Sequence, residues 1–204
     1  MVLYWLIWTS VRLYFFGWLR VRVEGLENVP AHGAAIVCVN HRSWADPLLV
    51  GGVFPRRLYY MAKQEMFSAF PFFHVILRTV GAFPVQRHKA DRKALRKAMA
   101  LLAAGRLVAV FPEGTRSKSG EVGKAEPGAA LLAVWSHKEV LPVGISGPYR
   151  RGQLVVRVGK PIVLTTEALR GKDLQVMADD QIMGAVRRLV EGPTLPARAA
   201  AGRS

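Results

Sequence analysis

A histidine and an aspartate five residues apart are the side chains of this sequence best placed for acid–base chemistry. His41 and Asp46 belong to the run Asn-His-Arg-Ser-Trp-Ala-Asp-Pro at residues 40–47. Their spacing does not put them on one face of a regular helix, where neighbours are three or four residues apart. Where a strand turns into a helix, however, Asp46 can fold back toward the imidazole. The pair would then be a general base and the carboxylate that orients it.

The segments on either side of this pair favour that arrangement. Residues 34–39 form an apolar, β-branched run that is typical of a buried strand. Asp46 followed by Pro47 predicts a helix start, with Asp46 as the N-cap and Pro47 as the first helical residue. A second interpretation is that Asp46 only caps this helix and takes no part in chemistry. The spacing alone leaves both interpretations open.

The composition indicates a basic protein with one ordinary α/β domain. The chain has 204 residues, and 29 Lys and Arg against 14 Asp and Glu give a formal net charge of +15. Such an excess predicts an anionic partner, which could be a nucleic acid, an anionic membrane surface or a phosphorylated substrate. We expect no nucleic-acid binding, because the basic residues are dispersed and no recognition module is visible. The single cysteine, Cys38, fits a reducing compartment and is expected to be a buried apolar residue.

The N-terminal segment is the strongest indication of membrane contact. Residues 1–19 are apolar except for Thr9, Ser10 and Arg12, and their length is at the lower limit for crossing a bilayer. Arg12 would lie near mid-depth in a simple span, and Trp and Tyr prefer the headgroup level. We therefore expect a helix that lies in one leaflet at the cytoplasmic face of the cell membrane, near anionic headgroups. The alternative is a helix packed on the domain's own core.

The remaining chain alternates between strand and helix patterns, which predicts an α/β fold: a single-domain layered sheet flanked by helices. Residues 1–22 are the membrane-associated segment, 23–191 the main domain and 192–204 a flexible tail. The expected strands are 20–24, 34–39, 58–62, 81–87, 107–111, 140–146 and 153–158. One expected helix follows Asp46, and the others cover 64–80, with Pro71 as a candidate break, 91–104, 129–137 and 174–191.

Charged residues follow the ends of several predicted strands. They are His41 and Asp46, Lys63, Arg87, and Glu113 with Arg116. Because such strand ends meet at one edge of a sheet, these side chains would form a basic pocket beside a base. A phosphorylated nucleophile would suit this pocket. We expect no metal site, because no His, Asp or Glu cluster has the spacing of metal ligands.

Four sequence blocks, taken in order, resemble the glycerolipid acyltransferases that use 1-acyl-sn-glycerol 3-phosphate. Each block alone is a weak signal, whereas the ordered set is specific. The blocks are Asn40-His41-x-Ser43-x-x-Asp46, Gly81 to Arg87, Phe111-Pro112-Glu113-Gly114-Thr115-Arg116 and Val140-Leu141-Pro142-Val143.

The resemblance implies transfer of an acyl chain from a thioester, acyl-CoA or acyl carrier protein, to the sn-2 hydroxyl of lysophosphatidic acid. The product is phosphatidic acid, and no resident cofactor is expected. By the same resemblance His41 is the general base and Asp46 its partner. Backbone N–H groups near the start of the helix after Asp46 are candidate donors to the tetrahedral oxyanion.

The resemblance also implies an acyl-acceptor site that binds phosphate. Its expected residues are Lys63, Arg87, Glu113, Gly114, Thr115 and Arg116. Arg116 can grip a phosphate with its planar guanidinium, and Gly114 lets the backbone approach the ligand. Lys63 and Arg87 could instead be solvated surface charges, and Glu113 could brace Arg116 without touching substrate.

Two other functions stay open from the sequence. An acyltransferase could use glycerol 3-phosphate or another lysolipid as its acceptor. A basic, non-catalytic membrane-binding protein would also account for the charge and the apolar N-terminus, although not for the ordered blocks.

Overall fold

A seven-stranded mixed sheet forms the centre of the molecule, in the strand order β1-β7-β6-β2-β5-β3-β4. The structure is a computed structural model that describes residues 2–68, 72–86, 91–117, 121–164 and 173–192. The β6–β7 pair is antiparallel and the other neighbouring pairs are parallel. The strands are β1 Arg22–Glu24, β2 Ala35–Val39, β3 Leu58–Lys63, β4 Ala82–Val85, β5 Leu107–Val110, β6 Val140–Ser146 and β7 Val155–Val158.

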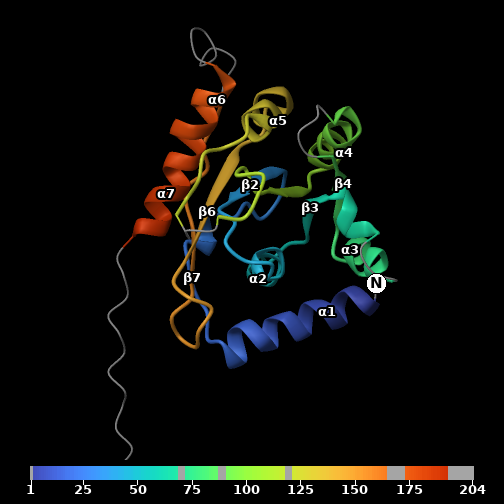
Figure 1. Ribbon diagram of the computed structural model, residues 1–204, viewed down its shortest axis with the longest axis vertical. Coiled ribbons are helices and arrows are strands. Elements are labelled where there is room, and N and C mark those ends of the chain that lie inside the picture. The colour runs from blue at the N-terminus through green and yellow to red at the C-terminus, as the bar shows by residue number, and fades with distance from the viewer. Residues whose placement is uncertain (1, 69–71, 87–90, 118–120, 165–172, 193–204) are drawn as a thin grey trace, which may run out of the picture.

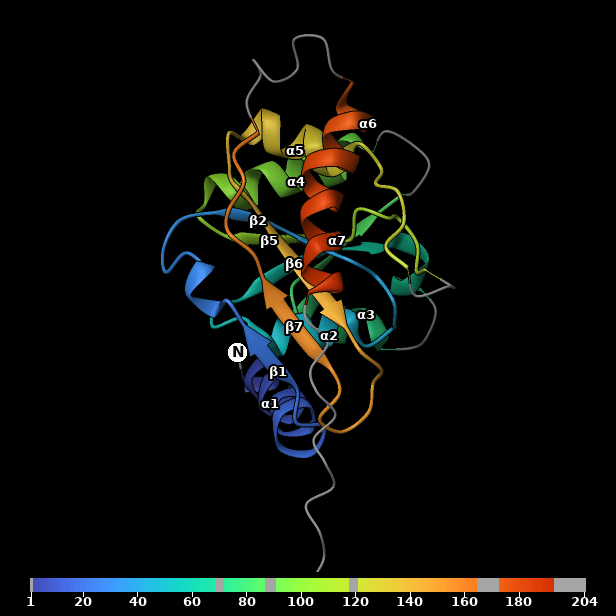
Figure 2. The ribbon, with the colours of Figure 1, turned by 90° about the vertical axis from the view of Figure 1, so that its left-hand side faces the viewer.

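Helices cover both faces of the sheet (Figure 1). On one face lie α1 and α2, and on the other lie α4, α5 and the C-terminal helix, which crosses β6 and β7 in Figure 2. The α-helices are α1 Val2–Arg12, α2 Asp46–Val53, α3 Phe73–Thr79, α4 Arg92–Ala103, α5 Gly128–Ser136, α6 Leu174–Met177 and α7 Gly184–Glu191. A π-helical turn, Ala178–Met183, joins α6 to α7. The predicted single α/β domain is confirmed.

Strand β2 lies at the centre and explains why its sequence is apolar throughout. Its five residues are all buried, and they alternate between the two layers. Val37 and Val39 face the α2 side, whereas Ile36 and Cys38 face the α4 and α5 side. A parallel strand covered on both faces needs apolar residues at every position. Burial raises the pKa of the Cys38 thiol to about 12, so this cysteine is an inert core residue as expected.

Helix α4 follows its sequence pattern closely. Asp91 caps it, because its carboxylate accepts the backbone N–H of Lys93 and of Ala94, each at 3.0 Å. Ala94, Ala98 and Leu102 are buried, whereas the basic residues between them face outward. The prediction of an amphipathic helix at 91–104 is confirmed.

One predicted helix start is wrong. Helix α2 begins at Asp46 itself and has Ala45 in the N-cap position, because the Asp46 carboxylate turns away from its own helix. The helix expected over residues 64–80, with Pro71 as a candidate break, is not continuous. Gln64–Phe67 is a single 3-10 turn, and α3 begins only at Phe73, after Phe72 adopts a left-handed backbone with φ of 64°.

The N-terminal helix α1 packs against the outside of α2, through the side of α1 that faces α2. Along Val2–Arg12 no residue is fully buried. Gly52 permits close approach, since a Cβ there would lie 2.9 Å from Val11 Cγ1. The Arg12 guanidinium donates to the Gly52 carbonyl at 2.7 Å. A π-helical turn, Leu13–Trp18, then leads to the buried Leu19. Among the helices that the structure describes, none combines the length and hydropathy needed to cross a bilayer.

Candidate active site

The end of β2 is fastened to β6 directly before the candidate base. Asn40 is fully buried, and its side-chain amide donates to the Ile145 carbonyl at 3.0 Å while accepting the Ile145 N–H at 2.7 Å. Both halves of the amide are therefore satisfied inside the core. This pair of bonds sets the direction in which the chain leaves the sheet at His41.

His41 and Asp46 meet through a direct hydrogen bond. The distance from His41 Nδ1 to Asp46 Oδ2 is 2.9 Å, and the Asp46 side chain is fully buried. The same oxygen accepts the backbone N–H of Arg42 at 2.6 Å and of Ser43 at 2.7 Å. The turn between strand and helix thus closes on the carboxylate. Because an ionised carboxylate only accepts, Nδ1 carries the proton and Nε2 is the nitrogen left for a substrate.

Glu113 holds the backbone of His41 in place. Its Oε1 accepts the His41 N–H at 2.8 Å, and its Oε2 accepts the Gly123 N–H at 3.2 Å. Burial raises the pKa of the Glu113 carboxyl, against the opposing effect of these two N–H donors. The Ser117 N–H also donates to the His41 carbonyl, at 2.8 Å. Glu113 therefore braces the histidine, and not Arg116 as the sequence alternative supposed.

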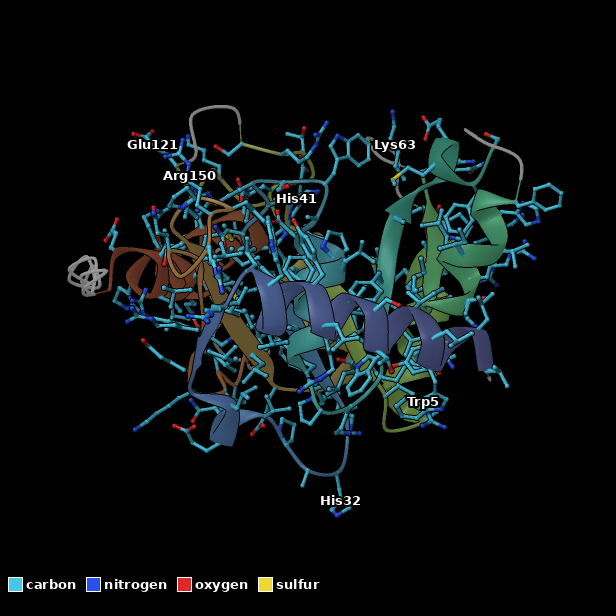
Figure 3. The ribbon with its side chains drawn as sticks, turned by 90° about the horizontal axis from the view of Figure 1, so that it is seen from below. Trp5, His32, His41, Lys63, Glu121 and Arg150 are labelled. Atoms are coloured by element: carbon cyan, nitrogen blue, oxygen red, sulfur yellow. The ribbon has the colours of Figure 1, made fainter. Side chains whose placement is uncertain are left out.

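An apolar cavity of about 570 Å³ opens beside His41 and extends beneath α1. Side chains from α1, α2, β3 and α3 line it, among them Trp8, Leu48, Tyr60 and Leu77. The polar lining residues besides the histidine include Lys63, Thr115 and Arg116. Figure 3 shows His41 and Lys63 in the upper half of the view, whereas Trp5 projects from α1 in the lower half. The lining of the cavity thus combines a base and cationic groups with apolar side chains.

The structure brings three of the six predicted acceptor residues, Lys63, Thr115 and Arg116, to this cavity. Arg116 stacks its guanidinium on Trp44, with the carbon atom 4.0 Å from the ring centroid. Lys63 Nζ lies 3.3 Å from Glu65 Oε1, and both side chains are well exposed. Gly114 adopts φ of 65°, which glycine tolerates best, and so turns the chain between Glu113 and the two lining residues that follow. Arg87 lies outside the described residues.

The backbone N–H groups of the turn before α2 are occupied. Those of Arg42 and Ser43 donate to Asp46, and that of Ala45 donates to Ser43 Oγ at 3.2 Å. An oxyanion donor near the start of α2 itself stays a prediction. Among the residues that the structure describes, no three His, Cys, Asp or Glu side chains gather in a way that could hold a metal ion.

Two residues of the site were missed by sequence reasoning. Trp44 stands between His41 and Asp46, and a tryptophan within this polar run was a usable signal in the sequence. In the structure this residue is 62% exposed. Tyr149 donates its phenol O–H to Asp46 Oδ1 at 2.5 Å from a turn 103 residues away. No local pattern could have connected that turn with the histidine.

Comparison with known proteins decides the family. A family model described as "Acyltransferase" matches residues 20–146, which include every element that carries His41, Asp46 and Arg116. This chain belongs to the acyltransferase family. The predicted family resemblance is therefore confirmed.

Named relatives and a solved structure agree with this membership. A 1-acyl-sn-glycerol-3-phosphate acyltransferase of Bacillus subtilis is 29% identical over 149 residues, which are 70% of this acyltransferase and 73% of the relative. A chloroplast protein of that name from Arabidopsis thaliana is 30% identical to this chain. The match covers 76% of this chain and 47% of the Arabidopsis protein. The crystal structure of the LPA acyltransferase PlsC from Thermotoga maritima superposes with a TM-score of 0.69 at 28% identity, covering 90% of this chain and 78% of that one.

Proposed function

We propose that this acyltransferase moves an acyl chain from a thioester to the sn-2 hydroxyl of 1-acyl-sn-glycerol 3-phosphate, giving phosphatidic acid. The observation that carries the proposal is the hydrogen-bonded pair of His41 and Asp46 beside an apolar cavity that Arg116 also lines. The names of the relatives from Bacillus subtilis and Thermotoga maritima support this choice of acceptor.

The dyad accounts for the chemical step. His41 Nε2 takes the proton of the sn-2 hydroxyl as its oxygen attacks the thioester carbonyl, because an alcohol is a poor nucleophile until a base removes its proton. Asp46 keeps the proton on Nδ1 and stabilises the imidazolium that forms. When the tetrahedral intermediate collapses, the carbon–sulfur bond breaks and the thiolate takes the proton from His41. The products are an ester and a free thiol.

The cavity and its cationic rim account for substrate binding. Apolar walls beneath α1 suit an acyl chain, since burial of each methylene group is worth roughly 0.8 kcal/mol. Arg116 is assigned to the acceptor phosphate, because Trp44 holds its planar guanidinium and leaves the N–H edge available. Thr115 and Lys63 are assigned to the same group, although Lys63 shares its charge with Glu65. Arg87 remains a predicted phosphate ligand.

The outer surface of α1 is proposed to lie in one leaflet at the cytoplasmic face of the cell membrane. Apart from Thr9 and Ser10, its exposed side chains are apolar or aromatic, and α3, which lies near the N-terminal end of α1 in Figure 1, adds others. Figure 3 shows the same region from below. The exposed residues are Val2, Leu3, Trp5, Leu6, Leu13, Tyr14 and Trp18 of the N-terminal segment, and Phe72, Val75 and Ile76. A lipid acceptor could then reach the cavity from the membrane. The co-substrate is proposed to be acyl-CoA or acyl carrier protein, with no resident cofactor and no nucleic acid.

The decisive experiment is a substrate panel with the purified protein on anionic vesicles. The acceptors are lysophosphatidic acid, glycerol 3-phosphate and lysophosphatidylcholine, each with acyl-CoA and with acyl carrier protein, and mass spectrometry follows the products. We expect phosphatidic acid from lysophosphatidic acid at the highest kcat/KM. Faster acylation of either other acceptor would refute the assignment, and absence of transfer to all three would favour a non-catalytic membrane protein.

A further inference from the structure

The turn between β6 and β7 contributes a side chain to the catalytic pair from far away in the sequence. Tyr149 donates its phenol O–H to Asp46 Oδ1. We propose that Tyr149 is a positioning residue of the acyl-transfer reaction: it fixes the Asp46 carboxylate so that Oδ2 stays aimed at His41 Nδ1. This inference rests on the proposed function, because it assumes that His41 acts as the base.

The two oxygens of Asp46 have divided roles. Oδ2 accepts from His41 and from the backbone N–H groups of Arg42 and Ser43, whereas Oδ1 accepts from Tyr149. Rotation about the Cβ–Cγ bond moves both oxygens together, so the bond from Tyr149 to Oδ1 adds a further restraint to the three bonds that hold Oδ2. A fully buried oxygen that lost its donor would in addition remain unsatisfied. The phenol supplies both the restraint and the donor.

Tyr149 is itself held from two sides. Its ring meets Phe15 of the N-terminal segment edge to face, with the centroids 6.4 Å apart. The Gly152 N–H of the same turn donates to the Leu19 carbonyl at 2.8 Å. Burial and the neighbouring charge of Asp46 raise the pKa of the Tyr149 phenol, so the group stays protonated and acts as a donor. The turn is therefore tied to the segment that leads out of α1.

Arg42 and Glu113 also lie beside this pair. Arg42 turns its guanidinium to the Gly147 carbonyl at 3.0 Å, and Glu113 contacts the His41 backbone N–H. Neither of these two side chains hydrogen-bonds to Asp46 in the way that Tyr149 does. Removal of the phenol would leave Oδ1 without the donor that Tyr149 supplies, so the orientation of the carboxylate toward His41 would be less well fixed.

The test compares Tyr149→Phe with Tyr59→Phe as its matched control. Tyr149→Phe keeps the ring that packs on Phe15 and removes only the hydroxyl. Tyr59 is a partly buried tyrosine of β3 that packs against the opposite core layer and does not line the cavity. For Tyr149→Phe we expect kcat to fall on the order of tenfold and KM for both substrates to stay unchanged. Tyr59→Phe should match the wild type in both measurements.

Two results would overturn the inference. One is a Tyr149→Phe enzyme with wild-type kcat. The other is a lowered kcat with a raised KM for both substrates and a lowered melting temperature, which would make the bond purely structural. Each variant is measured with whichever acceptor the wild-type protein acylates best. If lysophosphatidic acid is not the acceptor, the wild-type protein already shows this in the substrate panel. If Tyr149 has no positioning role, only the comparison of the variants with the wild type shows it.

Discussion

The two faces of the central sheet are built differently. The face covered by α4, α5 and the C-terminal helix is closely packed, with small residues such as Ala98 and Ala130 fully buried beside Leu132. The face covered by α1 and α2 contains the cavity, and α1 itself buries no residue completely. A filled layer supports the fold. A layer left partly open, with an apolar outer surface, leaves room for a lipid chain.

From this difference we expect substitutions on the α1 and α2 face to change activity or binding, and substitutions on the α4 and α5 face to change the free energy of unfolding. The largest effect should come from His41→Ala, which removes the proposed base. We expect kcat to fall by about 10³-fold, within the range of about 10² to 10⁴ that general-base catalysis contributes. Vesicle binding should be unchanged, as measured by co-sedimentation. Wild-type turnover in this variant would refute the mechanism.

On the opposite face, Leu132→Ala should act on the fold alone. Leu132 is fully buried in α5, and truncation of such a leucine costs about 2–5 kcal/mol of the free energy of unfolding. Denaturant unfolding would measure this loss. At a temperature where the variant is still folded, kcat/KM should equal that of the wild type. A large loss of kcat in the folded variant would show that the two layers are coupled.

Arg116→Ala should reveal the role of the cationic rim. Loss of a hydrogen-bonded charge is worth about 1.5–3 kcal/mol, so we expect KM for the phosphorylated acceptor to rise on the order of tenfold or more. KM for the thioester should change little, and so should the free energy of unfolding, because Arg116 packs on the exposed Trp44. An equal rise in both Michaelis constants would contradict the assignment of Arg116 to the acceptor.

The smallest effect is expected at the outer surface of α1. Leu6 is 60% exposed, does not line the cavity and would enter the leaflet. Leu6→Glu should weaken binding to anionic vesicles about tenfold, since the buried leucine is worth roughly 1.5–3 kcal/mol and the carboxylate is repelled. Val176→Glu is the matched control, because Val176 is an exposed residue of α6 on the other face. Equal loss of binding in both variants would show that α1 is not the membrane surface.

Sequence patterns predicted those features whose causes act over a few residues. The buried strand at 34–39 and the capped amphipathic helix at 91–104 follow from local apolar periodicity and from the Asp91 side chain. The contact between His41 and Asp46 also depends on a short turn, and the structure contains it. The start of α2 was misplaced by one residue because the same carboxylate could serve either the helix or the turn.

The tertiary structure alone decided how the proposed catalytic pair, His41 and Asp46, is supported. Glu113 reaches the His41 N–H across 72 residues, and Tyr149 reaches Asp46 across 103. Neither bond leaves a signal in the nearby sequence, since each depends on the order of the strands in the sheet and on the turns between them. The run of residues 40–47 by itself determined which side chains could do the chemistry. Only the folding of distant segments around them determined how the histidine is held.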